Sequence, residues 1–281
     1  MMKKVSEFFN NLFATLKSII KIILLSRRPG KLAKCTKPAD RIVVLGNGPS
    51  LKTTIAEKGE LLAALPTIAV NFMANTPEFL LLKPDYYVIA DPHFFKGIKN
   101  ENVANLWDNL SKTDWRMVLC VPCNMRKMAR ELVKNNEGIE ISGFNFVGAQ
   151  GFGWFENFVY NLRLAMPRPR NVLIPAIMTA IGAGYRNIYL AGADHSWLET
   201  IRVTDDNHVV SVQPHFYADS KKELKRSESE YKGFRLHDIL LSFYIAFRSY
   251  HTLARYARRN GIHIYNSTPG SFIDAFERRE F

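Results

Sequence analysis

The chain has 281 residues and a formal net charge of +12, and 47% of its residues are hydrophobic and 12% aromatic. This length and composition suit one α/β domain with a full core and an appended element, and they argue against intrinsic disorder. Three cysteines, Cys35, Cys120 and Cys123, are too few for a disulfide framework. Cys120 and Cys123 have redox-type spacing but end an apolar run, so buried thiols are the simpler interpretation.

The amino-terminal segment, residues 1–38, is basic and amphipathic. It carries nine lysines and arginines against one acid, Glu7, which gives 9 − 1 = +8 of the net charge. Apolar residues recur at helical spacing between residues 5 and 23, so we expect a helix with one apolar and one basic face. Such a helix is typical of peripheral contact with anionic lipid, and its longest apolar run, residues 22–25, is too short to span a membrane. The alternative is a helix packed on the protein's own body.

A glycine turn follows the next apolar run, residues 42–45, which predicts a buried strand, a tight turn and the start of a helix. The turn consists of Gly46, Asn47, Gly48, Pro49 and Ser50. Glycines let backbone amides approach an anion, and the amino end of a helix favours negative charge, so a nucleotide phosphate is the expected guest. The dinucleotide fingerprint is incomplete, because Leu51 replaces its third glycine and Asn71 its acidic ribose ligand. Simple chain reversal is the alternative interpretation.

Three further apolar runs also end on polar side chains. They cover residues 66–71, 85–91 and 187–194 and end on Asn71, Asp91 and Asp194. In a doubly wound sheet, ligands bind in the crevice outside the carboxyl ends of the strands. We therefore expect a Rossmann-like, mostly parallel sheet over residues 39–281, with Asn47, Asn71, Asp91 and Asp194 around one pocket. For any single one of these residues, a helix cap or a turn is the alternative.

The chain turns polar between residues 196 and 235, where we expect a lid or acceptor-binding element; a solvated excursion is the alternative. Within this stretch, Tyr217 lies in an aromatic island and is a candidate to reach a phosphate. A helical pattern follows and ends near Gly261, and a last strand then delivers a loop with Pro269 and Ser271 to the same edge of the sheet.

These ordered motifs resemble the bacterial sialyltransferases of glycosyltransferase family 42. The glycine turn is similar to their nucleotide-binding turn, Asn71 to an asparagine that contacts the nucleotide, and Asp91 to the start of their Asn-Pro segment. Residues 180–194 resemble their helix, strand and terminal aspartate, and residues 265–271 their late strand-end loop, so the resemblance spans residues 41–275. A related group of motility-associated and pterin-pyrophosphokinase-like Rossmann proteins carries the same turn.

The resemblance implies a Rossmann-like glycosyltransferase of a GT-A-like variant that needs no metal and no cofactor. It would move a nonulosonic, sialic-acid-like sugar from a CMP donor to a glycolipid or surface-glycan acceptor, on the inner face of the cytoplasmic membrane. A homo-oligomer is compatible with this interpretation. Nucleic acid is not an expected partner, because the charge is confined to the leader and no binding motif accompanies it. Two alternatives remain: an ATP- and Mg²⁺-dependent pyrophosphokinase-like enzyme, and a noncatalytic nucleotide-binding component of a glycan assembly complex.

Direct displacement at a sugar needs a base for the acceptor hydroxyl, and the ordinary pKa of histidine suits that role. His237 begins the helix after the polar stretch, a position similar to that of the family's catalytic histidine. His195 follows Asp194 directly and is the second candidate.

Overall fold

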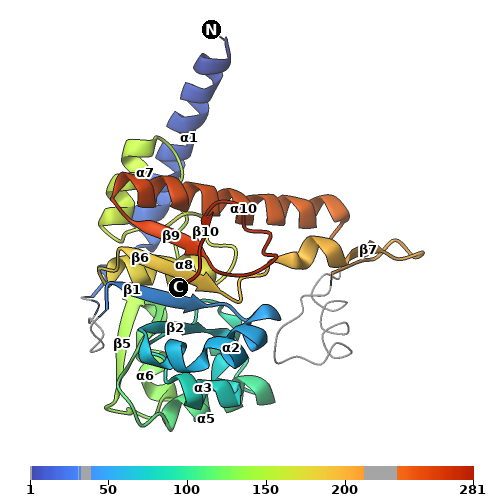
Figure 1. Ribbon diagram of the computed structural model, residues 1–281. Coiled ribbons are helices and arrows are strands. Elements are labelled where there is room, and N and C mark those ends of the chain that lie inside the picture. The colour runs from blue at the N-terminus through green and yellow to red at the C-terminus, as the bar shows by residue number, and fades with distance from the viewer. Residues whose placement is uncertain (1, 31, 33–38, 212–232) are drawn as a thin grey trace.

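The computed structural model describes residues 2–30, 32, 39–211 and 233–281. Its centre is an eight-stranded sheet in the order β10-β9-β6-β1-β2-β3-β4-β5, in which every neighbouring pair is parallel (Figure 1). Its strands are β1 (Arg41–Leu45), β2 (Thr67–Val70), β3 (Tyr86–Val88), β4 (Met117–Pro122), β5 (Ile139–Phe144), β6 (Asn187–Ala191), β9 (His263–Asn266) and β10 (Glu277–Arg278). The chain builds the sheet outward from β1 in both directions, which confirms the predicted Rossmann-like, doubly wound α/β fold.

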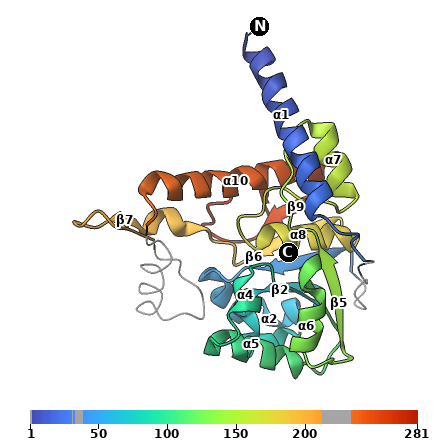
Figure 2. The same ribbon diagram turned by 180° about the vertical axis from the view of Figure 1, so that it is seen from behind.

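Helices cover both faces of the sheet. The α-helices are α1 (Met2–Leu25), α2 (Ser50–Ala64), α3 (Pro77–Leu82), α4 (His93–Lys96), α5 (Glu101–Ser111), α6 (Arg126–Leu132), α7 (Gly153–Asn161), α8 (Leu173–Gly182) and α10 (Leu236–Arg259). Among the described residues, the short 3-10 helices are η1 (Asn71–Asn75), η2 (Cys123–Met125) and η3 (Ser196–Thr200). A separate antiparallel hairpin of β7 (Ile201–Val203) and β8 (Val209–Ser211) projects from the body (Figures 1 and 2).

The central strands are apolar without interruption because both of their faces are covered. In β1, Ile42 and Val44 belong to the core under α8 and α10, whereas Val43 and Leu45 belong to the core under α2, α3 and α5. All four side chains are fully buried. The two hydrophobic layers therefore fix which face of the sheet each helix covers.

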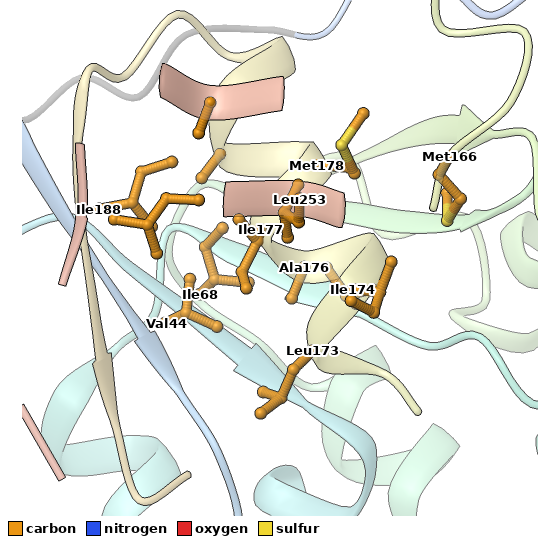
Figure 3. Packing of buried hydrophobic residues seen from close by; sticks show 14 of the residues in the cluster. Val44, Ile68, Met166, Leu173, Ile174, Ala176, Ile177, Met178, Ile188 and Leu253 are labelled. Atoms are coloured by element: carbon orange, nitrogen blue, oxygen red, sulfur yellow. The ribbon is translucent and has the colours of Figure 1, made fainter. Parts of the chain in front are cut away.

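Helix α8 forms the centre of one layer. Figure 3 shows Ile174, Ala176 and Ile177 of α8 packed between Val44 and Ile68 of the sheet on one side and Leu253 of α10 on the other. Among the ten residues of α8, eight are buried, so this helix is enclosed almost completely. Its burial holds α10 across the sheet, and the first turns of α10 extend to the side where the hairpin projects (Figures 1 and 2).

The predicted amino-terminal helix is present as α1, and its contact with the body is mainly polar, with the partly buried Ile22 and the Phe8 ring as apolar additions. Its buried side chains are Thr15 and Ser18, while large apolar residues such as Phe13 and Ile23 are more than 70% exposed. The helix thus packs on the protein's own body, while most of its large apolar side chains face outward. Residues 4–25 are, by length and composition alone, apolar enough to cross a membrane.

The predicted polar stretch, residues 196–235, begins as η3 and the β7–β8 hairpin. A small cluster of Val209, Ile239 and Phe243 joins the hairpin to α10, with Trp197 and Ile201 packed against it. This part of the stretch therefore has its own apolar contacts with the body. Tyr217 lies outside the described residues.

Candidate functional site

The carboxyl ends of β1 and β6 are neighbours at the point where the winding of the sheet reverses. The Gly46 N–H donates to the Ala191 carbonyl at 2.7 Å, and the Gly48 N–H donates to the Gly192 carbonyl at 2.9 Å. The two loops thus continue side by side beyond the strands. A Cβ on Gly192 would lie 2.6 Å from the Gly46 carbonyl oxygen, and the φ of Gly192 is +66°, so glycine is required there.

The anion at the amino end of α2 is the protein's own Asp194. Its Oδ1 accepts a hydrogen bond from the Ser50 N–H at 3.2 Å, and its Oδ2 accepts one from the Ser50 hydroxyl at 2.8 Å. Burial raises the pKa of Asp194, and the two hydrogen bonds from Ser50 oppose that shift. The carboxylate therefore stands where the sequence predicts a nucleotide phosphate. Gly48 is required beside it, because an added Cβ would overlap the Asp194 carboxyl group.

Asn47 and Asn71 lie at the ends of two adjacent strands, β1 and β2. The Asn47 side chain is buried, and its Nδ2 donates to the Val70 carbonyl at 3.0 Å. Asn71 has a left-handed backbone with φ of 50°, and its carbonyl accepts a hydrogen bond from the Tyr87 hydroxyl at 2.5 Å. Asparagine tolerates this conformation better than most residues. The structure thus brings Asn47, Asn71 and Asp194 to one edge of the sheet.

Asp91 lies at the same edge but away from the glycine turn. It follows β3, which is separated from β1 by β2, and two strand spacings amount to about 10 Å. Its Oδ1 accepts a hydrogen bond from the His93 N–H at 2.7 Å, and the side chain is exposed. Its observed contact is therefore that of a turn former at the start of α4.

Pro269 and Ser271 belong to the loop that leaves β9. The Ser271 hydroxyl donates to the Ala193 carbonyl at 2.6 Å and accepts from Asn266 Nδ2 at 3.0 Å. The Thr268 hydroxyl accepts from the Ala193 N–H at 3.0 Å. Ser271 is buried and Pro269 is exposed on the turn. The hydroxyl groups of this loop thus hold Ala193, the residue before Asp194, in place by hydrogen bonds. Pro269 is exposed, so a ligand can contact this part of the loop.

His195 lies in a buried aromatic cage behind Asp194. Its ring is 4.1 Å, centroid to centroid, from Trp197, and its Nε2 is 2.7 Å from the Tyr250 hydroxyl. The Tyr250 hydroxyl is also 3.0 Å from Asn171 Oδ1, and Asn171 Nδ2 is 3.4 Å from the His195 Nε2. Burial lowers the pKa of His195 to about 3. The ring is therefore a neutral structural group that links the Asp194 loop to α10.

His237 is in a different environment from His195. It lies in the first turn of α10, its side chain is 80% exposed, and its Nε2 is 3.3 Å from Asp238 Oδ1. The same turn packs against η3 through Ile239 and the apolar cluster with Trp197. The structure does not bring the His237 ring into contact with the glycine turn.

Sequence reasoning missed the partners of His195. Tyr250 is 55 residues and Asn171 is 24 residues away from it in the chain. Tyr250 is the tyrosine of the α10 pattern that faces the core, but no local signal links it to a histidine on another element. Within the described residues, no group of three or more histidine, cysteine, aspartate or glutamate side chains is arranged to hold a metal ion.

Comparison with known proteins adds a distant structural likeness. No protein-family model matches the chain, and no curated protein matches it. One solved structure, described as the MAf glycosyltransferase from Magnetospirillum magneticum AMB-1, is similar with a TM-score of 0.49 and 11% sequence identity. The match covers 97% of this chain and 38% of that chain, so the chain spans well under half the length of that protein.

Proposed function

We propose that the protein is a glycosyltransferase that binds a nucleotide-activated sugar at the carboxyl ends of β1 and β6. The observation that carries the proposal is that the polar side chains of Asn47, Ser50 and Asp194 lie together, next to the point where the backbones of Gly46 and Gly192 come close to each other. This is the switch point of an open parallel sheet, the place where such folds bind ligands. The ordered resemblance of these motifs to family 42 sialyltransferases supports the choice of a CMP-linked nonulosonic sugar as the donor.

The Asp194 carboxylate decides which end of the nucleotide faces the glycine turn. A carboxylate accepts hydrogen bonds from hydroxyl and amino groups and repels phosphate, so we place the ribose or base against Asp194 and Asn47. Exposed positive or polar side chains, His93 and Lys96 of α4, lie at the end of β3 on the same edge. Lys96 supplies positive charge, and His93 a polar ring, for the phosphate about two strand spacings away.

Transfer needs little covalent participation by the protein. The acceptor hydroxyl gives its proton to a base while its oxygen attacks the anomeric carbon, and the bond from that carbon to the phosphate oxygen breaks with the electron pair leaving on the nucleotide. We assign the base to His237, because its ring is open to solvent and its helix turn packs beside the segment that follows Asp194. His195 is enclosed and holds the Asp194 loop in place instead.

Nucleotide binding tests the proposal directly. Thermal shift of the intact chain with CMP, UDP, GDP or ATP, each with and without Mg²⁺, should show stabilisation by CMP without metal, since a ligand at 100 times its Kd adds about 2.7 kcal/mol. Asn47→Ala and Asp194→Asn should each weaken CMP binding by about 1–3 kcal/mol. Asp205→Asn, an exposed aspartate in the β7–β8 turn, is the matched control and should leave binding unchanged.

Donor hydrolysis and transfer assays separate the rival functions. Stabilisation by ATP only in the presence of Mg²⁺ would support the pyrophosphokinase-like enzyme and refute a sugar-nucleotide site. Binding of CMP without any hydrolysis of CMP-linked sugars would support the noncatalytic component. His237→Ala should lose transfer but keep CMP binding, because a base acts in the transition state.

A further inference from the structure

Two helices on one side of the molecule expose large apolar side chains. On α1, Phe9, Phe13, Ile20 and Ile23 are between 59% and 77% exposed. On α7 and its carboxyl-terminal cap, Trp154, Phe158 and Leu162 are 70%, 58% and 47% exposed. Their spacing of four residues places them on one face of the helix. Neither group takes part in the apolar core of the sheet.

The two apolar faces form one surface. The ring centroid of Phe8 on α1 is 5.5 Å from that of Phe152, and the Phe152 ring is 6.5 Å from Trp154 and nearly parallel to it. Phe152 is the residue before α7, so these rings connect the helices without a gap. Both views of the molecule show α1 beside α7 (Figures 1 and 2).

The carboxyl-terminal half of α1 is fixed to the body through its small polar side chains. The Ser18 hydroxyl donates to the Gln150 carbonyl at 2.8 Å, and the Thr15 hydroxyl accepts from the Phe152 N–H at 3.1 Å. The Ser26 hydroxyl donates to the Leu164 carbonyl at 2.6 Å. These bonds leave the apolar face of α1 turned outward.

This attachment limits how α1 can enter a bilayer. Residues 4–13 are exposed throughout, and these ten residues, whose Phe8 ring contacts Phe152, have a length of about 15 Å. The hydrocarbon core of a bilayer is about 30 Å thick. While its hydroxyl contacts hold, this exposed stretch of α1 therefore reaches into one leaflet.

Positive charge borders the apolar surface. Lys17 and Lys21 are exposed on α1, and Arg255 and Arg259 are exposed on α10, whose Arg259 Nη1 donates to the Gly153 carbonyl of α7 at 2.8 Å. The acid on α7, Glu156, is half-buried and accepts a hydrogen bond from the Gly151 N–H at 3.2 Å. The border thus carries a net positive charge toward the outside, which complements anionic lipid.

We infer that α1 and α7 together form a monotopic binding surface for an anionic bilayer, with Trp154 and Phe158 inserted beside the apolar face of α1. A second copy of the chain fits less well, because a two-fold contact through this surface would bring Lys17 and Lys21 of both copies together. The inference deepens the membrane location expected for the proposed enzyme and adds α7 and the α10 arginines to the leader. Lipid binding can be tested separately from nucleotide binding, because the proposed nucleotide site is at the carboxyl edge of the sheet and not on α1 or α7.

Cosedimentation of the full chain with vesicles tests the surface. Vesicles of phosphatidylcholine with about one third phosphatidylglycerol should bind the protein, and pure phosphatidylcholine should bind it much less. The double variant Trp154→Ser/Phe158→Ser should lower the partition coefficient at least about tenfold, since each buried aromatic side chain contributes about that factor. The matched control is Leu80→Ser/Leu81→Ser on α3, two residues that are 65% and 60% exposed far from α1. It should bind as the unaltered chain does.

Four further results test the inference. CMP-induced thermal stabilisation should be the same in both double variants, which separates a failure of this surface from a failure of the nucleotide site. Vesicle binding that is unchanged in Trp154→Ser/Phe158→Ser would overturn the role of α7. A concentration-dependent dimer that this variant abolishes, without vesicle binding, would show a protein interface instead, and a probe at Asn10 protected on the far side of sealed vesicles would show a spanning helix.

Discussion

Acid should destabilise this protein through one buried histidine. The His195 ring is enclosed by Trp197, Tyr250 and Phe247, and it bonds to the Tyr250 hydroxyl at 2.7 Å. Its folded-state pKa is about 3, against an ordinary value of 6.5. Between these two values the unfolded chain binds a proton that the folded chain does not, so the free energy of unfolding rises with pH across this window. Stability from His195 is complete above pH 6.5 and is lost as the pH falls toward 3.

The size of this change in unfolding free energy depends on how much of the pH range between the two pKa values of His195 is crossed. Moving from neutral pH to about pH 5 covers roughly 1.5 of the pKa units below 6.5, and each unit corresponds to about 1.4 kcal/mol. The unfolding free energy should therefore fall by about 2 kcal/mol because of His195 alone. Asp194 and Glu156 have raised pKa values, so their contributions have the opposite sign. Their contributions are also present in a variant that lacks only the His195 ring, so they cancel when the pH dependence of that variant is subtracted from that of the unaltered chain.

Urea unfolding at about pH 7.5 and about pH 5 measures this term. His195→Gln keeps an amide that can bond to Tyr250 but has no titrating ring, so it should lose about 2 kcal/mol less than the unaltered chain between the two pH values. His237→Gln is the matched control, because its ring is 80% exposed, and it should keep the full pH dependence. Equal pH dependence in the unaltered chain and His195→Gln would refute the assignment of the acid sensitivity to this ring.

Two further substitutions test the packing around α1 and the glycine turn. Asn145→Ala should lower the unfolding free energy in urea by about 1–3 kcal/mol, because buried Asn145 bonds to the Arg27 N–H and carbonyl and to the Arg163 carbonyl; the same value for the exposed Asn10→Ala variant would contradict this. Gly48→Ala should destabilise the fold and weaken CMP binding, because its Cβ would push Asp194 away from Ser50, whereas Gly59→Ala within α2 meets only side chains at 3.7 Å or more and should be neutral or stabilising.

Sequence periodicity was sufficient for the sheet and for part of the site. The apolar runs before Asn47, Asn71 and Asp194 are strands, and their parallel pairing brings these ends to one edge, as the rule for doubly wound sheets predicts. The phosphate expected at the start of α2 was beyond such reasoning. A glycine turn shows that an anion fits there, but only the pairing of β1 with β6 shows that the Asp194 carboxylate, 144 residues later, takes the place.

The histidines and the leader show a second limit of sequence reasoning. Helix-start spacing placed His237 in the first turn of α10, but the exposure of its ring depends on where tertiary packing puts that turn. In α1, the pattern correctly separated an apolar from a polar face. Which face contacts the body depended on backbone groups of residues 150–152 that bond to Ser18 and Thr15, and these have no signature in the helix itself.

The order of the strands also determines how long one edge of β1 remains unpaired while the chain is being synthesised. β1 pairs with β2 on one side and with β6 on the other, and the register places Leu45 opposite Ala191, 191 − 45 = 146 residues later. At roughly 5–20 residues per second, a ribosome needs roughly 7–30 s to make that stretch. During this interval the first five strands are complete while one edge of β1 has no neighbour, and a free apolar edge is a template for aggregation. Nascent chains should therefore depend on chaperones until β6 has been made.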